Sequence, residues 1–100
     1  MKTWYETILQ QLGGNMFVAM TGAKQFSYKE KPTKTMYFKI GRNCKGVNYV
    51  GITLNEGLDL YNMEFLKVGK ERKVLKSYIG IYFDQLRPLF TESTGMYTSL

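Results

Sequence analysis

The sequence predicts an α+β fold: a four- or five-stranded antiparallel sheet (a meander), with an N-terminal helix and a C-terminal helix covering one face. Apolar residues recur at helical spacing near both ends of the chain. Between them, short segments alternate apolar and polar residues, which is typical of strands with one buried face. Only short turns separate these segments, and this favours antiparallel neighbours. We expect one domain over residues 1–100.

The first predicted element is a helix over residues 3–12. Thr3 and Glu6 have the spacing of a capping box, in which the Thr side chain accepts from the third helical N–H and Glu6 reaches back to the cap. Gly13 and Gly14 provide the C-terminal stop. The residues that share the buried face of this helix are Tyr5, Ile8, Leu9 and Leu12.

Five segments of the central region are predicted strands, and turns follow at 21–23, 43–46 and 55–57. Pro32 breaks the chain between the second and third strands, since proline cannot donate to a ladder. The predicted strands are 16–20, 25–28, 35–40, 48–54 and 61–65. By alternation, the buried side chains are Met36, Phe38, Ile40, Val50, Ile52, Leu54, Tyr61, Met63 and Phe65. The opposite face would carry Tyr37, Lys39, Tyr49, Thr53 and Lys67.

The C-terminal region predicts a charged loop at 69–73 and then a helix that Ser77 caps and Gly95 ends. Residues 74 and 75 either begin a further strand or lead into this helix. Pro88 removes one helical hydrogen bond, so we expect a kink or break near 85–88. Residues 96–100 are a predicted tail. The residues expected on the apolar helix face are Ile79, Tyr82, Phe83, Leu86 and Phe90.

Composition excludes several chemistries. The chain has no His, so His-based acid–base catalysis and His metal ligation are impossible. Cys44 is the single cysteine, which rules out an intrachain disulfide and a structural zinc site and suits a reducing compartment. The glycines at 41–46 lack the Lys-Ser/Thr of a phosphate loop and indicate a turn. We therefore expect no enzymatic activity, no metal and no cofactor.

The sequence also predicts a location. No apolar run approaches the roughly 20 residues of a membrane span. The first residues lack the apolar region of a signal peptide. A cytoplasmic protein with no membrane partner is the expectation.

The net charge of +6 is concentrated in two stretches. Residues 24–45 hold seven Lys and Arg against one Glu, and residues 67–76 hold five against one Glu. The segment between them is acidic. Charge this uneven reports on partners rather than on fold.

Tyrosines among lysines on one sheet face predict an interface for nucleic acid, particularly single strands, or for a nucleic-acid-bound complex. Aromatic rings stack on bases at about 1–3 kcal/mol each, and lysines meet the phosphates. A merely solvated basic face, or one that docks an acidic protein surface of a host complex, explains the same residues. The predicted contact residues are Tyr37, Lys39, Tyr49, Lys67, Lys70, Arg72 and Lys73.

Several strings resemble a family of small, uncharacterised accessory proteins of bacteriophages and conjugative elements. They are TILQQLGGN at 7–15, FVAMTGAK at 17–24, YNMEF at 61–65 and TGMYT at 94–98. The resemblance implies work in a bacterial cytoplasm, on nucleic acid or against a host defence complex. An inhibitor of a host nuclease or defence complex, of anti-restriction or anti-CRISPR type, is the alternative function. The family brings no catalytic residues.

Overall fold

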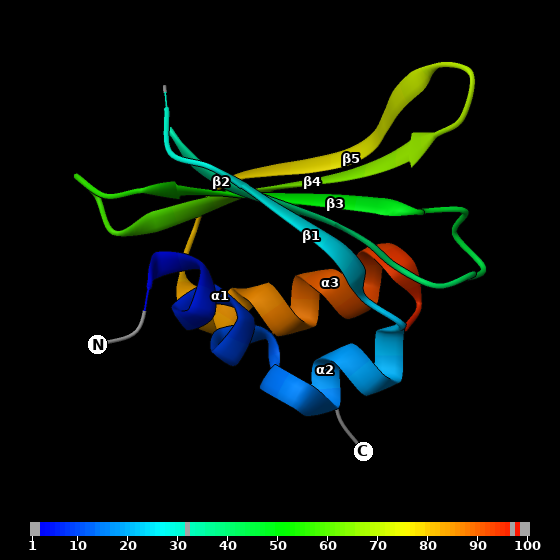
Figure 1. Ribbon diagram of the computed structural model, residues 1–100, viewed down its shortest axis with the longest axis horizontal. Coiled ribbons are helices and arrows are strands. Elements are labelled where there is room, and N and C mark those ends of the chain that lie inside the picture. Colours follow the sequence, from blue (N-terminus) through cyan, green and yellow to red (C-terminus); the bar gives the residue numbers. More distant parts are fainter. Residues whose placement is uncertain (1–2, 32, 97, 99–100) are drawn as a thin grey trace.

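The computed structural model describes residues 3–31, 33–96 and 98, and its five strands form one antiparallel sheet in the order β1-β2-β3-β4-β5. All three helices lie against one face of this sheet and leave the other face uncovered (Figure 1). The predicted α+β meander is confirmed. The elements are α1 (Trp4–Leu12), α2 (Gly14–Thr21), β1 (Lys24–Lys29), β2 (Lys34–Lys39), β3 (Tyr49–Asn55), β4 (Leu60–Val68), β5 (Arg72–Ile81), a short 3-10 turn η1 (Phe83–Gln85) and α3 (Leu86–Thr94).

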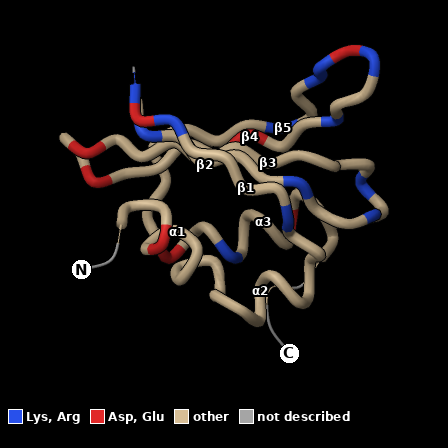
Figure 2. Tube along the Cα trace, viewed as in Figure 1, with Lys and Arg blue, Asp and Glu red and all other residues tan. Residues whose placement is uncertain are grey.

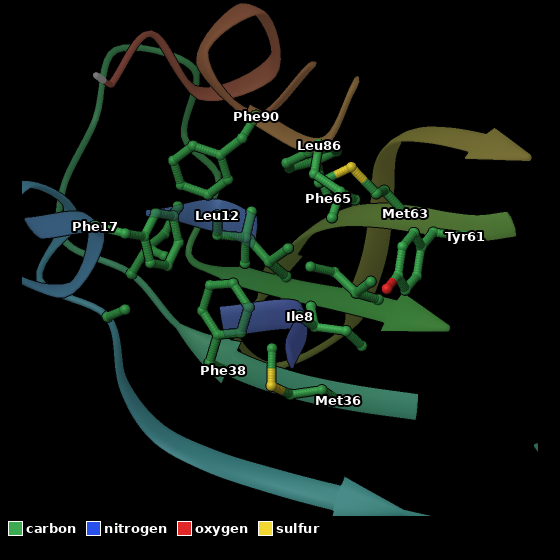
Figure 3. Close-up of a cluster of buried hydrophobic side chains, with 14 of the residues drawn as sticks. Ile8, Leu12, Phe17, Met36, Phe38, Tyr61, Met63, Phe65, Leu86 and Phe90 are labelled. Atoms are coloured by element: carbon green, nitrogen blue, oxygen red, sulfur yellow. The ribbon is translucent and has the colours of Figure 1, made fainter. Parts of the chain in front are cut away.

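The core lies between the helix layer and the sheet (Figure 3). Phe17 of α2 connects the sheet side and the helix side of the core. The ring centroid of Phe17 lies 5.7 Å from that of Phe38 in β2 and 5.0 Å from that of Phe90 in α3. Both contacts are edge-to-face, the arrangement that aromatic quadrupoles favour. The fully buried large side chains of this core are Ile8, Leu12, Phe17, Met36, Phe38, Val50, Ile52, Met63, Phe65, Leu86 and Phe90.

The first helix begins after Thr3 and ends before Gly13 as predicted, but only the Thr3 half of the expected capping box is present. The Thr3 side chain accepts a hydrogen bond from the Glu6 N–H at 3.2 Å. Gly13 follows the last residue of α1 at a φ of 130°, and its N–H donates to the carbonyl of Gln10. Ile8 and Leu12 of the predicted apolar face are fully buried.

The prediction of a strand at 16–20 is wrong, because this segment is the helix α2. A run of five apolar residues fits a buried helix as well as a strand. The turn decides between them: Gly13 and Gly14 both have positive φ, so the chain turns directly from one helix into the next. Gly22, left-handed at φ 68°, ends α2 and forms the predicted turn at 21–23.

The prediction of a helix from Ser77 is also wrong, because residues 72–81 form β5. Gly80 has a φ of 69° and interrupts the pairing of β5 with β4, and the interior of a right-handed helix cannot contain that conformation. Of the apolar face expected there, Leu86 and Phe90 are buried, but Ile79 is 83% exposed. Tyr82 and Phe83 are exposed as well.

The final helix starts where a kink was expected. α3 begins at Leu86, which puts Pro88 in the first turn, where an N–H has no helical partner and proline is tolerated. Gly95, at φ 76°, caps the helix as predicted. Thr98 of the expected tail is buried and accepts a hydrogen bond from Arg87 at 3.1 Å, and the tail residues 97, 99 and 100 lie outside the described residues.

The other four predicted strands are confirmed as β1 to β4, with different boundaries. The largest difference is in β4, which continues to Val68, three residues beyond the predicted end. The loop expected at 69–73 shortens accordingly, since β5 begins at Arg72. Pro32, the predicted break, lies outside the described residues.

Candidate nucleic-acid interface

The uncovered sheet face carries the residues that alternate away from the core. In the register of β2 and β3, Tyr37 pairs with Gly51 and Lys39 with Tyr49. Both tyrosines are half-buried, and Lys39 is exposed. The predicted outward placement of Tyr37, Lys39, Tyr49 and Thr53 is therefore confirmed.

The two tyrosines form a pair that Gly51 makes possible. Their ring centroids are 5.9 Å apart, with ring planes 25° from parallel. The Tyr37 ring lies across Gly51, where a Cβ atom would come 2.6 Å from the ring carbon Cε1. A strand glycine commonly marks such a close approach, and here it lets the ring lie down on the sheet.

Arg72 reaches this pair from the start of β5. Its guanidinium carbon lies over the Tyr37 ring, 5.5 Å from the centroid, a cation–π distance. Its Nη2 is 3.8 Å from the Glu64 carboxylate. The interaction with Tyr37 raises the pKa of Arg72 above its ordinary value, while burial opposes this. Tyr37 therefore has Gly51 beneath it, Tyr49 beside it and Arg72 over it.

A separate apolar contact forms around Leu66 on this face. It is fully buried but does not belong to the core beneath the helices. It pairs with Tyr49 on one side and with Val74 on the other. This small cluster holds the end of the β4–β5 hairpin against the tyrosine pair.

The β4–β5 hairpin extends beyond the edge of β3. Tyr49, the first residue of β3, pairs with Leu66, and the residues of β4 after Leu66 have no partner in β3. We call residues 67–73 the arm. Figure 1 shows that this hairpin bends away from the helix layer. Asn48 holds its base: its side-chain amide donates to the Val68 carbonyl at 2.8 Å and its side-chain oxygen accepts from the Val68 N–H at 2.7 Å.

The placement predicted for Lys67 is wrong. Leu66 points to the uncovered face, so by strand alternation Lys67 points to the opposite side, together with its partner Lys73. Arg72, which pairs with Val68, shares the side of Leu66. Lys70 lies in the turn at the tip. The predicted contact residues thus divide between the two sides of the arm and the neighbouring sheet face.

Antiparallel pairing brings cations from four separate segments to one end of the sheet. Lys24 of β1 pairs with Lys39 of β2, the 40–48 loop follows, and the arm lies next to it (Figure 2). Asn48 connects this loop to the arm. We call this the basic end. Among the described residues, its eight exposed cations are Lys24, Lys39, Arg42, Lys45, Lys67, Lys70, Arg72 and Lys73.

At the opposite end of the sheet the charges balance. The β1–β2 and β3–β4 turns meet there, and Lys34 forms an ion pair with Glu56 at 2.9 Å. The charged residues of these two turns and their flanks are Lys29, Glu30, Lys31, Lys34, Glu56 and Asp59, three of each sign. The basic stretch 24–45 is therefore split between a balanced end and the basic end.

Sequence reasoning did not name Lys24, Arg42 and Lys45 as contact residues. The register that joins them to the arm was implicit in the meander order, because alternate turns of a meander fall at the same end of a sheet. Charge counted along the chain cannot show this.

We also searched the part of the chain that the structure describes for a metal site, a membrane-spanning helix and a paired thiol. No group of three or more Cys, Asp or Glu side chains gathers there as metal ligands would. None of the described helices has the length and apolar character needed to cross a membrane. Cys44 is exposed, with its sulfur 4.0 Å from the Thr94 carbonyl oxygen.

No protein-family model, curated protein or solved structure matches this chain. The resemblance to accessory proteins of mobile elements therefore stays a prediction from sequence strings.

Proposed function

We propose that this protein is a non-enzymatic nucleic-acid-binding protein that contacts the phosphate backbone through its basic end. One observation carries the proposal: eight exposed cations from four segments converge on one end of the sheet, while the other end is balanced. A cationic patch concentrated on one surface is the electrostatic footprint of a nucleic-acid binder.

The physical basis is counterion release. Each phosphate that a Lys or Arg neutralises frees condensed counterions, so the logarithm of the binding constant falls with the logarithm of salt by about 0.9 per contact on duplex DNA and about 0.7 on single strands. The cations of the basic end are exposed, so they can reach phosphates without a rearrangement of the fold. Affinity would be steeply salt-dependent and weakly sequence-dependent.

The tyrosine pair has a supporting role in this proposal. The sequence suggested that Tyr37 and Tyr49 stack on bases, but Tyr37 is already in contact with Gly51, Tyr49 and Arg72. We therefore assign most of the affinity to the cations. The tyrosines position Arg72 and hold the base of the arm.

The test compares two triple variants that remove the same charge. Lys24→Gln/Arg42→Gln/Lys45→Gln changes the basic end, and Lys29→Gln/Lys31→Gln/Lys34→Gln changes the balanced end. Each variant is titrated into a labelled 25-base-pair duplex and into its single strand at two salt concentrations. These titrations give the affinity and its dependence on salt. We expect the first variant to lose about tenfold or more in affinity and about one unit of salt slope per cation.

The second triple variant should bind within about twofold of the wild-type protein, because surface charges far from the ligand are screened. Equal losses in both variants would mean that only net charge matters and would contradict the proposal. So would a wild-type protein that binds no nucleic acid at low salt. If that protein instead co-purifies with a lysate protein after nuclease treatment, the basic end docks an acidic protein surface.

A further inference from the structure

We propose that the arm enters the major groove of B-form DNA. The inference rests on the proposed nucleic-acid function and names its ligand as duplex DNA, in preference to a single strand or RNA. Three features of the structure support duplex DNA as the ligand: the shape of the arm, the distribution of charge on its two sides and the contacts of the tyrosines.

The arm has the dimensions of a groove-reading ribbon. Two strands about 4.8 Å apart, with their side chains, fit the major groove of B-DNA, which is about 12 Å wide and admits a two-stranded ribbon. From Val68 to Lys70 at the tip the arm spans two residue steps, or about 7 Å, which is most of the groove depth of about 8.5 Å. The major groove of A-form RNA is too narrow for such a ribbon.

Charge lies on both sides of the arm. Arg72 is on the side of the uncovered sheet face, Lys67 and Lys73 are on the other side, and Lys70 is at the tip. A single strand that tracks along the protein would meet only one side. A groove has a phosphate backbone on each wall, so cations on both sides of an inserted ribbon each find a phosphate.

The tip also holds a carboxylate. Glu71 is exposed between Lys70 and Arg72, and its backbone carbonyl accepts from Gly69. On a phosphate track this carboxylate would be repelled. At the floor of a major groove it can accept from the N4 amino group of cytosine.

The contacts of the tyrosines argue against a single strand. Proteins that bind single strands offer free aromatic faces on which bases stack. Tyr37 instead has Gly51 beneath its ring and Arg72 over it, and Tyr49 stacks against it. The two bonds from Asn48 hold the base of the arm, which favours a preformed ribbon.

The experiment measures binding to a 20-base-pair DNA duplex, its single strand and the RNA duplex of the same sequence, at one salt concentration. A second DNA duplex carries bulky C5 adducts on its pyrimidines, which fill the major groove, and a third is saturated with netropsin, which fills the minor groove. We expect the DNA duplex to bind about tenfold tighter than the single strand or RNA. The adducts should abolish this advantage, and netropsin should leave it intact.

Lys67→Gln/Lys70→Gln/Lys73→Gln, whose side chains are all exposed, should reduce the preference for duplex DNA while the circular dichroism spectrum stays unchanged. The charge-matched control is Lys29→Gln/Lys31→Gln/Lys34→Gln. Single-strand binding as tight as duplex binding, or insensitivity to the adducts, would overturn this inference and leave the proposed function standing. Failure to bind any of the nucleic acids would overturn both.

Discussion

At the residue scale, the absence of a side chain at Gly51 shapes the uncovered face. The Tyr37 ring occupies the volume that a Cβ would need, and the position of that ring sets the contacts with Tyr49 and Arg72. Sequence alternation predicted which way Tyr37 and Tyr49 face. It could not predict the contact with Arg72, which is 35 positions away along the chain and arrives through the bend of the hairpin.

We expect Gly51→Ala to lower the free energy of unfolding by about 1–3 kcal/mol, because the new methyl group displaces the Tyr37 ring. Urea unfolding followed by circular dichroism measures this. The matched control is Gly57→Ala, where the nearest atom to an added Cβ is a side-chain oxygen at 3.6 Å, and it should stay within about 0.5 kcal/mol. A Gly51→Ala protein as stable as the control would show that the ring moves at no cost.

At the scale of elements, local signals succeeded where they were redundant. The first helix had a cap, a periodic apolar face and a glycine stop, and all three agree in the structure. The predicted strand at 35–40 alternates apolar and polar residues, and so do the predicted strands before and after it. The segment at 16–20 had a single signal, a short apolar run that fits helix or strand. The helix expected from Ser77 had a cap, an apolar face and a glycine stop, but the left-handed Gly80 excludes its first turns, and only the part from Leu86 onward forms.

The arm depends on Asn48, whose side chain closes two hydrogen bonds on Val68. We expect Asn48→Ala to destabilise the protein by about 1–2 kcal/mol, since each bond contributes about 0.5–1.5 kcal/mol. Amide hydrogen exchange should then accelerate at Val68 more than at Val50 in the centre of the sheet.

Asn15→Ala is the control for this variant, because Asn15 is exposed on α2 and away from the arm. Exchange at Val68 that remains as slow as in the wild-type protein would mean that strand pairing alone holds the base of the arm.

At the scale of the whole molecule, all three helices and the sheet share one core. We therefore expect a single cooperative unfolding transition. Trp4, whose ring centroid lies 6.3 Å from that of Tyr28 on the edge strand β1, reports on the first helix and this edge by fluorescence. Far-UV circular dichroism reports on the whole fold. The two urea midpoints should coincide, and separate midpoints would show that the N-terminal helices unfold independently.

Local pattern and composition were sufficient to predict the fold class, four of the five strands, the faces of β2 and β3, and the chemistries that a chain without His cannot perform. These follow from local periodicity and composition, which need no knowledge of neighbours. The helix at 14–21, the fifth strand and the division of charge between the two ends of the sheet emerged from the three-dimensional fold alone. Each depends on chain reversal and strand register, which bring together residues far apart in sequence, so that Lys24 and Arg42 belong with the arm while Lys34 pairs with Glu56.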